Sequence, residues 1–342
     1  MRRAALALVL AVLVLLPLTV TGPAAGAPRK DAVFAVQDTD ITESSGLIDQ
    51  GDTVVTINDS LHGPTLYVLD SRTGATVGRT TYSSDPAIDT EALARGRDGA
   101  VWVGDIGDND AARDLVSVYR VGRVGPGDRT VDAQRYDLRY PGGPRDAETL
   151  LVDPDDGRLY VVSKGLFGGQ LFEAPRVLRP DAVNLLRPVG RVGGLVTDGD
   201  FLPDGKHVVV RDYGDAFVYS LRPWEQVGDW ALPAQPQGEG LSVRPSGTDV
   251  IVSSEGTGMA VLTDAIPPRL LRATSPQPTP TPSASPEDRG TAAPAQPSGA
   301  SEDRSSGSPD VVAVAGIAAV GLAALVAVGA LVRRVRQRRS TT

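Results

Sequence analysis

The sequence predicts an all-β fold, a β-propeller of five blades, from three observations. Short runs rich in β-branched and aromatic residues recur along the chain, and Gly, Asp and Pro turns separate them. Five segments share one frame, in which an acidic residue precedes an apolar pair, a polar turn and a second strand. The frames recur at intervals of 39 to 57 residues, close to the length of a four-stranded blade. Six blades are the main alternative, because the intervals are uneven.

The first 27 residues have the pattern of a secretory signal peptide. Arg2 and Arg3 precede an apolar stretch over residues 4–20, and small residues follow at 24–27. An uncleaved amino-terminal anchor is the alternative, although the apolar run is short for a membrane span. We therefore expect the chain to be exported.

Residues 31–272 form the predicted propeller. The strand pair of the first frame includes residues 53–57, and the runs 65–69 and 76–82 supply two further strands. The last frame is shorter than the others. The run Ala32–Val36 is predicted to complete this last blade and to close the ring, which would hide its sheet edges.

The composition of the chain excludes several classes of site. The 342 residues contain no cysteine and two histidines, which disfavours thiolate and polyhistidine metal sites. Residues 31–272 carry 37 acidic and 23 basic side chains. Nucleic-acid binding needs the opposite balance of charge, so no nucleic-acid partner is expected.

One acidic residue stands at the same place in each frame, before the innermost strand of each predicted blade. In an up-and-down blade, the connection into this strand and the loop between the second and third strands lie on one face. We therefore expect a ring of acidic side chains at one mouth of the central channel. The ring residues are Glu43, Glu91, Glu148, Asp200 and Glu239. Polar residues that end the second strands should surround them, namely Asn58, Asp59, Asp105, Asp108, Asn109, Lys164, Arg211 and Glu255.

Carboxylates packed in one ring cannot all stay ionised without partners. Ca²⁺ is the natural candidate cofactor, because it takes six to eight oxygen ligands. Asp59 and the loop residues Asp105, Asp108 and Asn109 are the candidate metal ligands, while Lys164 and Arg211 would neutralise the ring or hold an anionic ligand. Alternatively, the ring acids accept backbone N–H bonds between blades, and the loop acids make turns.

Four stretches carry a resemblance to a known group of proteins. SSGL (44–47), VWVGDIGDN (101–109), RDAETLLVDPDDGRLYVVSK (145–164) and PQGEGL (236–241) resemble secreted actinobacterial β-propeller proteins with GDIGDN-type loops. They are more distantly similar to the β-propeller phytase and esterase-like phytase group. The phytase likeness implies Ca²⁺-assisted hydrolysis of phosphate esters. This chain is shorter and poorer in lysine than that group.

Three segments follow the predicted propeller. Residues 273–309 are rich in proline and contain no aromatic residue, which predicts a disordered stalk. Val311–Val332 carries no charge over 22 residues, so residues 310–332 are predicted to cross the membrane as a helix. The basic tail at 333–342 should stay cytoplasmic. The sequence thus predicts a single-pass plasma-membrane protein whose propeller lies outside the cell.

Two functions follow from this reading. In the first, the propeller binds a small-molecule or protein ligand at its acidic mouth, with Ca²⁺ as a cofactor. In the second, it is a Ca²⁺-dependent phytase-like or esterase-like hydrolase of an anionic substrate. The candidate ligand-binding residues are the five ring acids with Lys164, Arg211 and Glu255.

Overall fold

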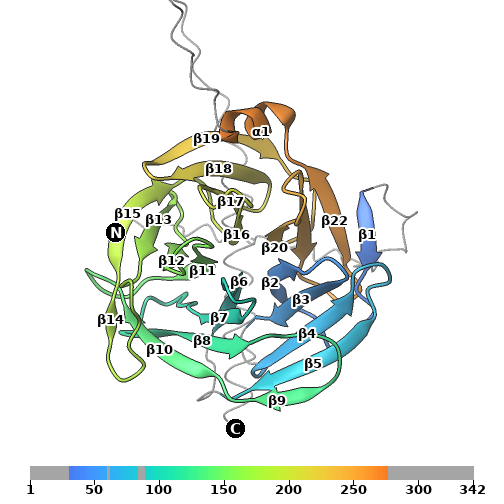
Figure 1. Cartoon of the computed structure of the whole chain (residues 1–342), viewed down its shortest axis with the longest axis horizontal. Helices are drawn as coiled ribbons and strands as arrows, with labels where there is room; N and C mark the ends of the chain where they lie inside the picture. Colours follow the sequence, from blue (N-terminus) through green and yellow to red (C-terminus); the bar gives the residue numbers. More distant parts are fainter. Residues whose placement is uncertain (1–30, 60–61, 84–88, 276–342) are drawn as a thin grey trace, which may run out of the picture. The chain divides into compact units, whose positions relative to one another are not determined.

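The structure, a computed structural model, describes residues 31–59, 62–83 and 89–275. These residues form a β-propeller of five blades around one channel (Figure 1). The predicted count of five is confirmed, and the alternative of six blades is wrong. The predicted signal peptide, stalk and membrane span lie outside the described residues. Within the described part, no helix is long and apolar enough to cross a membrane.

Each blade is a sheet whose strands follow one another outward from the channel. Blade 1 contains β2 (Ser44–Asp49), β3 (Thr53–Asn58), β4 (Thr65–Asp70) and β5 (Thr76–Tyr82). Blade 2 contains β6 (Thr90–Arg95), β7 (Val101–Asp105), β8 (Val116–Gly122) and β10 (Gln134–Arg139). Blade 3 contains β11 (Ala147–Val152), β12 (Leu159–Ser163), β13 (Gly169–Glu173) and β15 (Arg187–Val192). Blade 4 contains β16 (Asp198–Phe201), β17 (His207–Arg211), β18 (Asp215–Leu221) and β19 (Trp224–Ala231).

Blade 5 is built from both ends of the propeller. It contains β20 (Gly238–Val243), β21 (Asp249–Ser254), β22 (Ala260–Ala265) and the amino-terminal strand β1 (Ala32–Ala35). β1 pairs antiparallel with β22, and Ala35 lies opposite Ala260. The predicted closure of the ring by the first strand is therefore confirmed. Opening the ring would require this sheet to separate.

Additional short elements cover the outer edges of several blades. β9 (Arg129–Val131) leaves blade 2 and pairs in parallel with β5 of blade 1. In the same way β14 (Asn184–Leu185) leaves blade 3 and pairs with β10 of blade 2. The helix α1 (Pro268–Thr274) packs on β19, with Leu270 against Gly228. Covered edges are protected from pairing with other chains.

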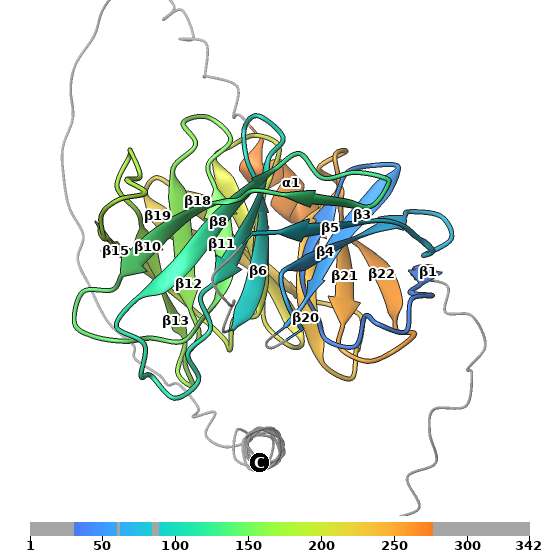
Figure 2. The ribbon, with the colours of Figure 1, turned by 90° about the horizontal axis from the view of Figure 1, so that it is seen from below.

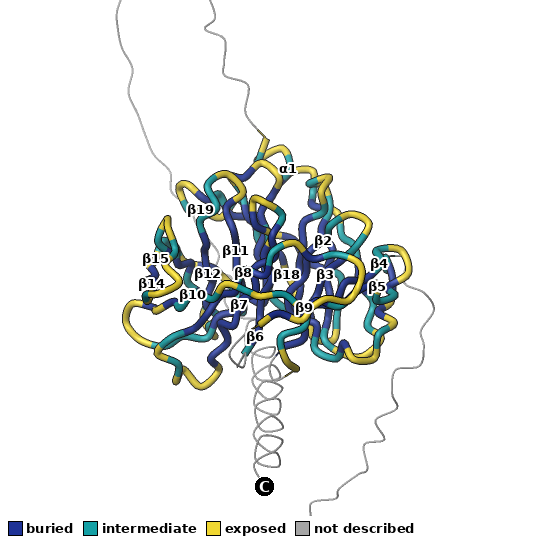
Figure 3. Tube along the Cα trace, turned by 60° about the horizontal axis from the view of Figure 1, so that its bottom comes forward, coloured by how far each residue is buried: buried dark blue, intermediate teal, exposed yellow. Residues whose placement is uncertain are grey.

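The apolar core is divided among the contacts between neighbouring blades. Five clusters of buried apolar side chains each join two adjacent blades, and together they pass around the ring. Between blades 2 and 3, for example, the rings of Tyr140 and Phe172 meet edge to face at 5.0 Å. Figure 3 shows the inner strands as buried and the loops as largely exposed. Each blade is thus held by its neighbours on both sides.

The inner strands β2, β6, β11, β16 and β20 contact one another in a closed ring. Where they come closest, each carries a small residue, namely Gly46, Ala92, Thr149, Gly199 and Gly240. A Cβ atom on Gly46 would lie 2.4 Å from the backbone nitrogen of Leu93, and one on Gly240 would lie 2.9 Å from the carbonyl oxygen of Ser45. Glycine is therefore required at these positions for the inner strands to approach.

Replacing Gly46 with alanine should lower the free energy of unfolding by about 2 kcal/mol or more, because the new methyl group would overlap backbone atoms of blade 2. Urea denaturation measures this change. Gly125→Ala is the control, since a methyl group there would meet no atom within 4 Å, and it should change stability by less than about 0.5 kcal/mol. Equal stability of the two variants would contradict the close approach of the inner strands.

Candidate functional site

A repeated irregularity shapes the start of the inner strands. In blades 1, 2, 3 and 5 the pairing between the first two strands shifts by one residue, which is a β-bulge. The bulged residue directly after the first paired residue is Glu91, Glu148 or Glu239 in three of these blades and Ser45 in blade 1. Blade 4 pairs without a shift. Three of the five predicted ring acids thus occupy one structural position.

The strands run between two faces formed by loops (Figure 2). The bulges lie on the face that carries the connections into the inner strands and the loops between second and third strands. We call this the mouth face. Bulges re-aim side chains, and they are common beside functional sites.

The mouth face holds a compact group of carboxylates from blades 1 and 2. Asp59 follows β3, Asp89 precedes β6, and Glu91 lies at the bulge of β6. One carboxylate oxygen from each lies within 4.8 Å of the others. Asp59 and Glu91 are buried, and Asp89 is half-buried. We call these three residues the acidic triad.

Gly107 explains why the GDIGDN loop passes so close to the acidic triad. A Cβ atom at this position would lie 2.6 Å from a carboxylate oxygen of Asp89 and 2.8 Å from Cγ of Glu91. The backbone N–H of Gly107 also donates to the carbonyl oxygen of Asp89. The glycine therefore lets the loop pack directly on two of the three carboxylates.

A second group joins blades 3 and 4 on the same face. Nζ of Lys164 lies 2.7 Å from Oε1 of Glu148 and 3.1 Å from the hydroxyl oxygen of Tyr213. Lys164 follows β12, and Tyr213 lies in the loop after β17. The ammonium uses two of its three donors in these contacts. Its side chain is 18% exposed.

Glu239 of blade 5 interacts electrostatically with members of both groups. Burial raises its pKa, the charges of Lys164 and Arg211 act in the opposite direction, and Asp59 adds repulsion. Its Oε2 atom is buried and has no hydrogen-bond partner among the described residues. Glu239 is thus a buried carboxyl group with unused hydrogen-bonding capacity in the mouth.

Burial dominates the electrostatics of the glutamates. It raises the pKa of Glu91 well above its usual range, and repulsion from Glu148 and Asp59 adds to this effect. Burial also raises the pKa of Glu148, although the neighbouring Lys164 opposes the shift. Burial acts to lower the pKa of Lys164, but the attraction of Glu148 and Glu239 holds it well above its ordinary value. Burial and mutual repulsion therefore favour neutralisation of these glutamates, by protons or by a cation.

Arg211 lies apart from the mouth opening. Its side chain is fully buried, and Nη1 donates to the carbonyl oxygen of Gly240 and to Oε1 of Gln235, both at 3.1 Å. Nε donates to the carbonyl oxygen of Asp212. Burial lowers the pKa of Arg211 to about 10. The guanidinium thus joins blade 4 to blade 5. Because the side chain of Arg211 is not exposed, an anionic ligand at the mouth would not reach it in this structure.

The predicted metal ligands of the GDIGDN loop have other contacts. Asp105 accepts the N–H of Asp89 and pairs with Nη1 of Arg113 at 3.0 Å. Asp108 accepts the N–H groups of Ala112 and Arg113, which makes it a turn residue. Asn109 is exposed. Of the four predicted metal ligands, Asp59 is the one that the structure brings into the acidic triad.

The other predicted acids, Glu43, Asp200 and Glu255, lie outside the bulge position of the three glutamates. Glu43 precedes β2 and pairs with His62, with 3.2 Å between Oε2 and Nδ1. Asp200 lies further along β16, where its Oδ2 accepts the Ser242 hydroxyl and the N–H of Val243 in blade 5. Glu255 follows β21, and its N–H donates to the carbonyl oxygen of Gln237. Neither Glu43 nor Asp200 shares the bulge position of the three glutamates.

Three residues of the mouth were not among the predicted site residues. Asp89 and Asp146 each stand two positions before a ring glutamate, at the start of their frames. Asp146 accepts the N–H of Asp108 through Oδ1, and burial raises its pKa. The recurrence of an acid two residues before the ring glutamate could have identified Asp89 and Asp146 from the sequence. No sequence pattern could have identified Tyr213, because only the fold brings it to Lys164.

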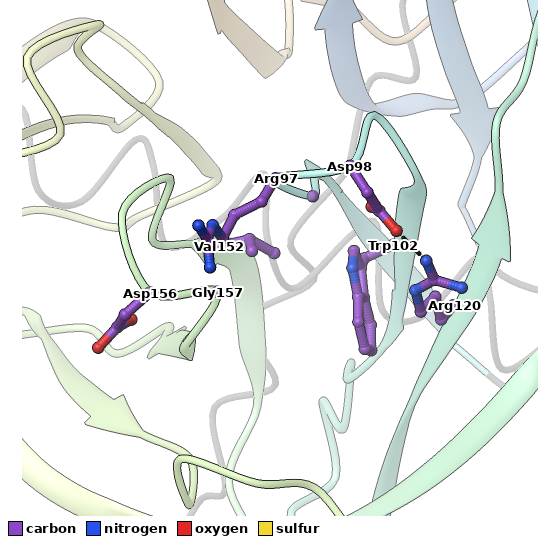
Figure 4. Close-up of a pocket in the computed structure, with 8 residues that line it drawn as sticks. Arg97, Asp98, Trp102, Arg120, Val152, Asp156 and Gly157 are labelled. Atoms are coloured by element: carbon purple, nitrogen blue, oxygen red, sulfur yellow. Dashed lines mark hydrogen bonds and ion pairs between the residues drawn. The ribbon is translucent and has the colours of Figure 1, made fainter.

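A cavity of about 480 Å³ lies at the opposite end of blades 2 and 3 (Figure 4). Its lining includes Arg97, Trp102 and Asp156, and an ion pair between Asp98 and Arg120 borders it. None of the predicted site residues lines it. Five of its residues belong to turns between first and second strands, away from the mouth face, and Trp102, Arg120 and Val152 belong to strands.

No family model and no curated protein matches the sequence. Among solved structures, the chain is similar to a gluconolactonase from Xanthomonas campestris, with 18% identity, a TM-score of 0.41, and coverage of 65% of this chain and 72% of that one. It is also similar to a luciferin-regenerating enzyme, with 13% identity, a TM-score of 0.40, and coverage of 64% and 76%. Both neighbours are β-propeller enzymes. At these values the likeness concerns the fold alone.

The raised pKa values predict how stability depends on pH when chelator keeps cations away. The folded state holds these protons more tightly than the unfolded chain, so this contribution to stability is fully present below the unfolded glutamate pKa of about 4.3 and is lost as pH rises through the raised folded-state pKa values. The free energy of unfolding should therefore fall between about pH 5 and about pH 7.5, by up to about 1.4 kcal/mol per pH unit for each titrating group.

Glu91→Gln should be more stable than the original chain at about pH 7.5 and should show a smaller slope, because the amide removes a buried charge without changing shape. Glu225→Gln is the matched control, since Glu225 is exposed on β19. It should keep the original slope. Chemical denaturation across the pH range measures both variants, and a flat profile for the original chain would count against the buried charges.

Proposed function

We propose that the mouth face binds a divalent cation of the Ca²⁺ class together with a small acidic ligand. The acidic triad carries this proposal, because three carboxylates from two blades place oxygens within 4.8 Å of one another. Hard cations such as Ca²⁺ prefer such all-oxygen donors. The cysteine-free chain offers no softer donor set.

The charges of the mouth fit a cation. Glu91 is repelled by Glu148 and Asp59, and the ammonium of Lys164 attracts both glutamates. A divalent cation on Asp59, Asp89 and Glu91 would offset their repulsion. When bound, it would supply positive charge that anchors an oxygen of the ligand.

Lys164 supplies the second anchor. Glu148 and Tyr213 hold its ammonium in place and take two of its three donors, and among the described residues no further hydrogen bond of this ammonium is seen, so the third would bind an acidic group. The ligand would thus be held by one fixed cationic side chain and by the cation on the acidic triad. Charge-assisted hydrogen bonds of this kind are stronger than neutral ones.

We propose that the propeller is displayed at the cell surface. The amino-terminal pattern of a signal peptide and the uncharged run Val311–Val332, followed by five arginines, support this location. The mouth would then meet ligands outside the cell, where Ca²⁺ sites of modest affinity are filled.

Thermal unfolding with Ca²⁺ and with chelator tests the cation. A ligand present at about 100 times its Kd stabilises the folded state by about 2.7 kcal/mol, which corresponds to about 5–10 °C in Tm for a domain of this size. Glu91→Gln should abolish most of the shift, because it removes a triad charge. Asp181→Asn, which changes an exposed acid, should keep it. The absence of any shift for the original chain would remove the cation from the proposal.

Hydrolysis is the second candidate function, and Glu148 favours it. Its carboxyl group is buried, has a raised pKa and contacts Lys164 at 2.7 Å. A carboxyl group with a raised pKa can act as a general acid or base. Turnover of a panel of phosphate and carboxylate esters should then be lost in Glu148→Gln. Absence of turnover in the original chain would leave ligand binding as the function.

A further inference from the structure

Two large apolar side chains stand at the apex of a loop beside the mouth. The loop joins β12 to β13, and its exposed fractions are 71% for Leu166 and 93% for Phe167. The N–H of Gly168 donates to the carbonyl oxygen of Gly165 at 3.0 Å, which closes a β-turn. Leu166 and Phe167 therefore occupy its two corner positions, where Asn, Asp, Gly or Pro is usual.

The backbone around this turn is held in place. Gly168 has a φ of +99°, and a Cβ atom on Gly169 would lie 2.0 Å from the carbonyl oxygen of Ser163. The Ser163 hydroxyl accepts the N–H of Gln170 at 3.1 Å. The glycines thus shape a defined turn that presents its two apolar side chains outward, and neither belongs to the apolar clusters between blades.

The turn begins one residue after the ammonium of the mouth. Lys164 directly precedes Gly165, its N–H donates to the carbonyl oxygen of Asp146, and its Nζ contacts Glu148. Lys164 and the apolar turn thus belong to one short loop between β12 and β13, on the mouth face.

We propose that Leu166 and Phe167 form an apolar subsite, so that the ligand of the mouth is amphiphilic. Its acidic head would bind Lys164 and the cation on the acidic triad, and its alkyl or aryl part would cover the two apolar side chains. This inference rests on the proposed function, and it names the class of ligand. Covering exposed apolar surface supplies binding free energy in proportion to the area removed from water.

A small amphiphile fits the turn better than a membrane surface does. Leu166 and Phe167 occupy the two corners of a single turn, an apolar area that a small molecule can cover. The other strongly exposed apolar residues of blade 3, Val177 and Leu185, lie on the connection between its third and fourth strands, at the opposite face. No continuous apolar face is thus formed by the described residues of this blade.

Alkyl phosphates of increasing length test the subsite. The full chain, held in amphipol with excess Ca²⁺, is titrated calorimetrically with methyl, butyl and hexyl phosphate. Full burial of one CH₂ tightens binding about fourfold, so partial burial should make hexyl phosphate bind at least about tenfold more tightly than methyl phosphate. In the double variant Leu166→Ser/Phe167→Ser, methyl phosphate should bind as before and the gain with chain length should vanish.

The double variant Val177→Ser/Leu185→Ser is the matched control, because it removes equally exposed apolar side chains from the other face. It should keep the gain with chain length. No gain in the original chain, or an equal loss in both double variants, would overturn the subsite. The Ca²⁺-dependent Tm shift, measured on the same samples, is independent of the turn and shows whether the cation site itself has failed.

Sedimentation with phosphatidylcholine–phosphatidylserine vesicles tests whether a lipid bilayer, rather than a small amphiphile, covers the apolar turn. The inference would be overturned if the original chain bound the vesicles, the Leu166→Ser/Phe167→Ser variant did not, and affinity did not rise with the length of the alkyl phosphate. The turn would then be a site for a lipid bilayer. Equal behaviour of the two chains toward vesicles, together with the gain along the series, is the expected result.

Discussion

Every other feature of this propeller depends on the close approach of its five inner strands. At Gly46 and Gly240 the neighbouring backbone leaves no room for a side chain, and Thr149 packs its methyl group against Gly199. This contact narrows the channel below the mouth. Larger polar side chains must therefore project above it, and the β-bulges provide the extra residue that places Glu91, Glu148 and Glu239 there.

The resulting site is asymmetric although the fold is repetitive. Blade 1 has Ser45 at the bulge, and blade 4 has no bulge. In blade 4, Asp198 and Asp200 accept backbone N–H groups of Leu241 and Val243, so two acids of this blade bind the next inner strand. Acidic side chains consequently gather over blades 1, 2, 3 and 5, with the half-buried Lys164 as their cationic neighbour. A ligand at the mouth would therefore meet carboxylates from several blades together with the ammonium of Lys164.

The fold was more predictable from sequence than the site. Each frame encodes one local strand pair joined by a short turn, so the number of frames equals the number of blades. The run at 32–36 was recognisable as the strand that completes the last blade. Spacing could not reveal the bulges. A bulge inserts one residue, and a shift of one residue moves a side chain to the other side of a strand. Glu43 and Asp200 were therefore aligned with three glutamates whose position they do not share.

A difference of one residue in strand position also distinguishes the two cationic side chains Arg211 and Lys164. Arg211 is the last paired residue of its strand, the position held by Asn58, Asp105, Ser163 and Ser254 in the other blades. Asn58, Asp105 and Ser254 hold the chain that enters the inner strand, and Ser163 holds the loop that follows its own strand. Lys164 comes one residue later, the place of Asp59 in blade 1, and its N–H bonds the entering chain as that of Asp59 does. Successive side chains of a strand point to opposite sides, so the two positions place their side chains differently. The later position places Asp59 and Lys164 at the mouth in blades 1 and 3, although in blade 2 it holds Ile106 of the apolar core. The earlier position in blade 4 places Arg211 in the contact with blade 5, where it bonds the carbonyl oxygen of Gly240.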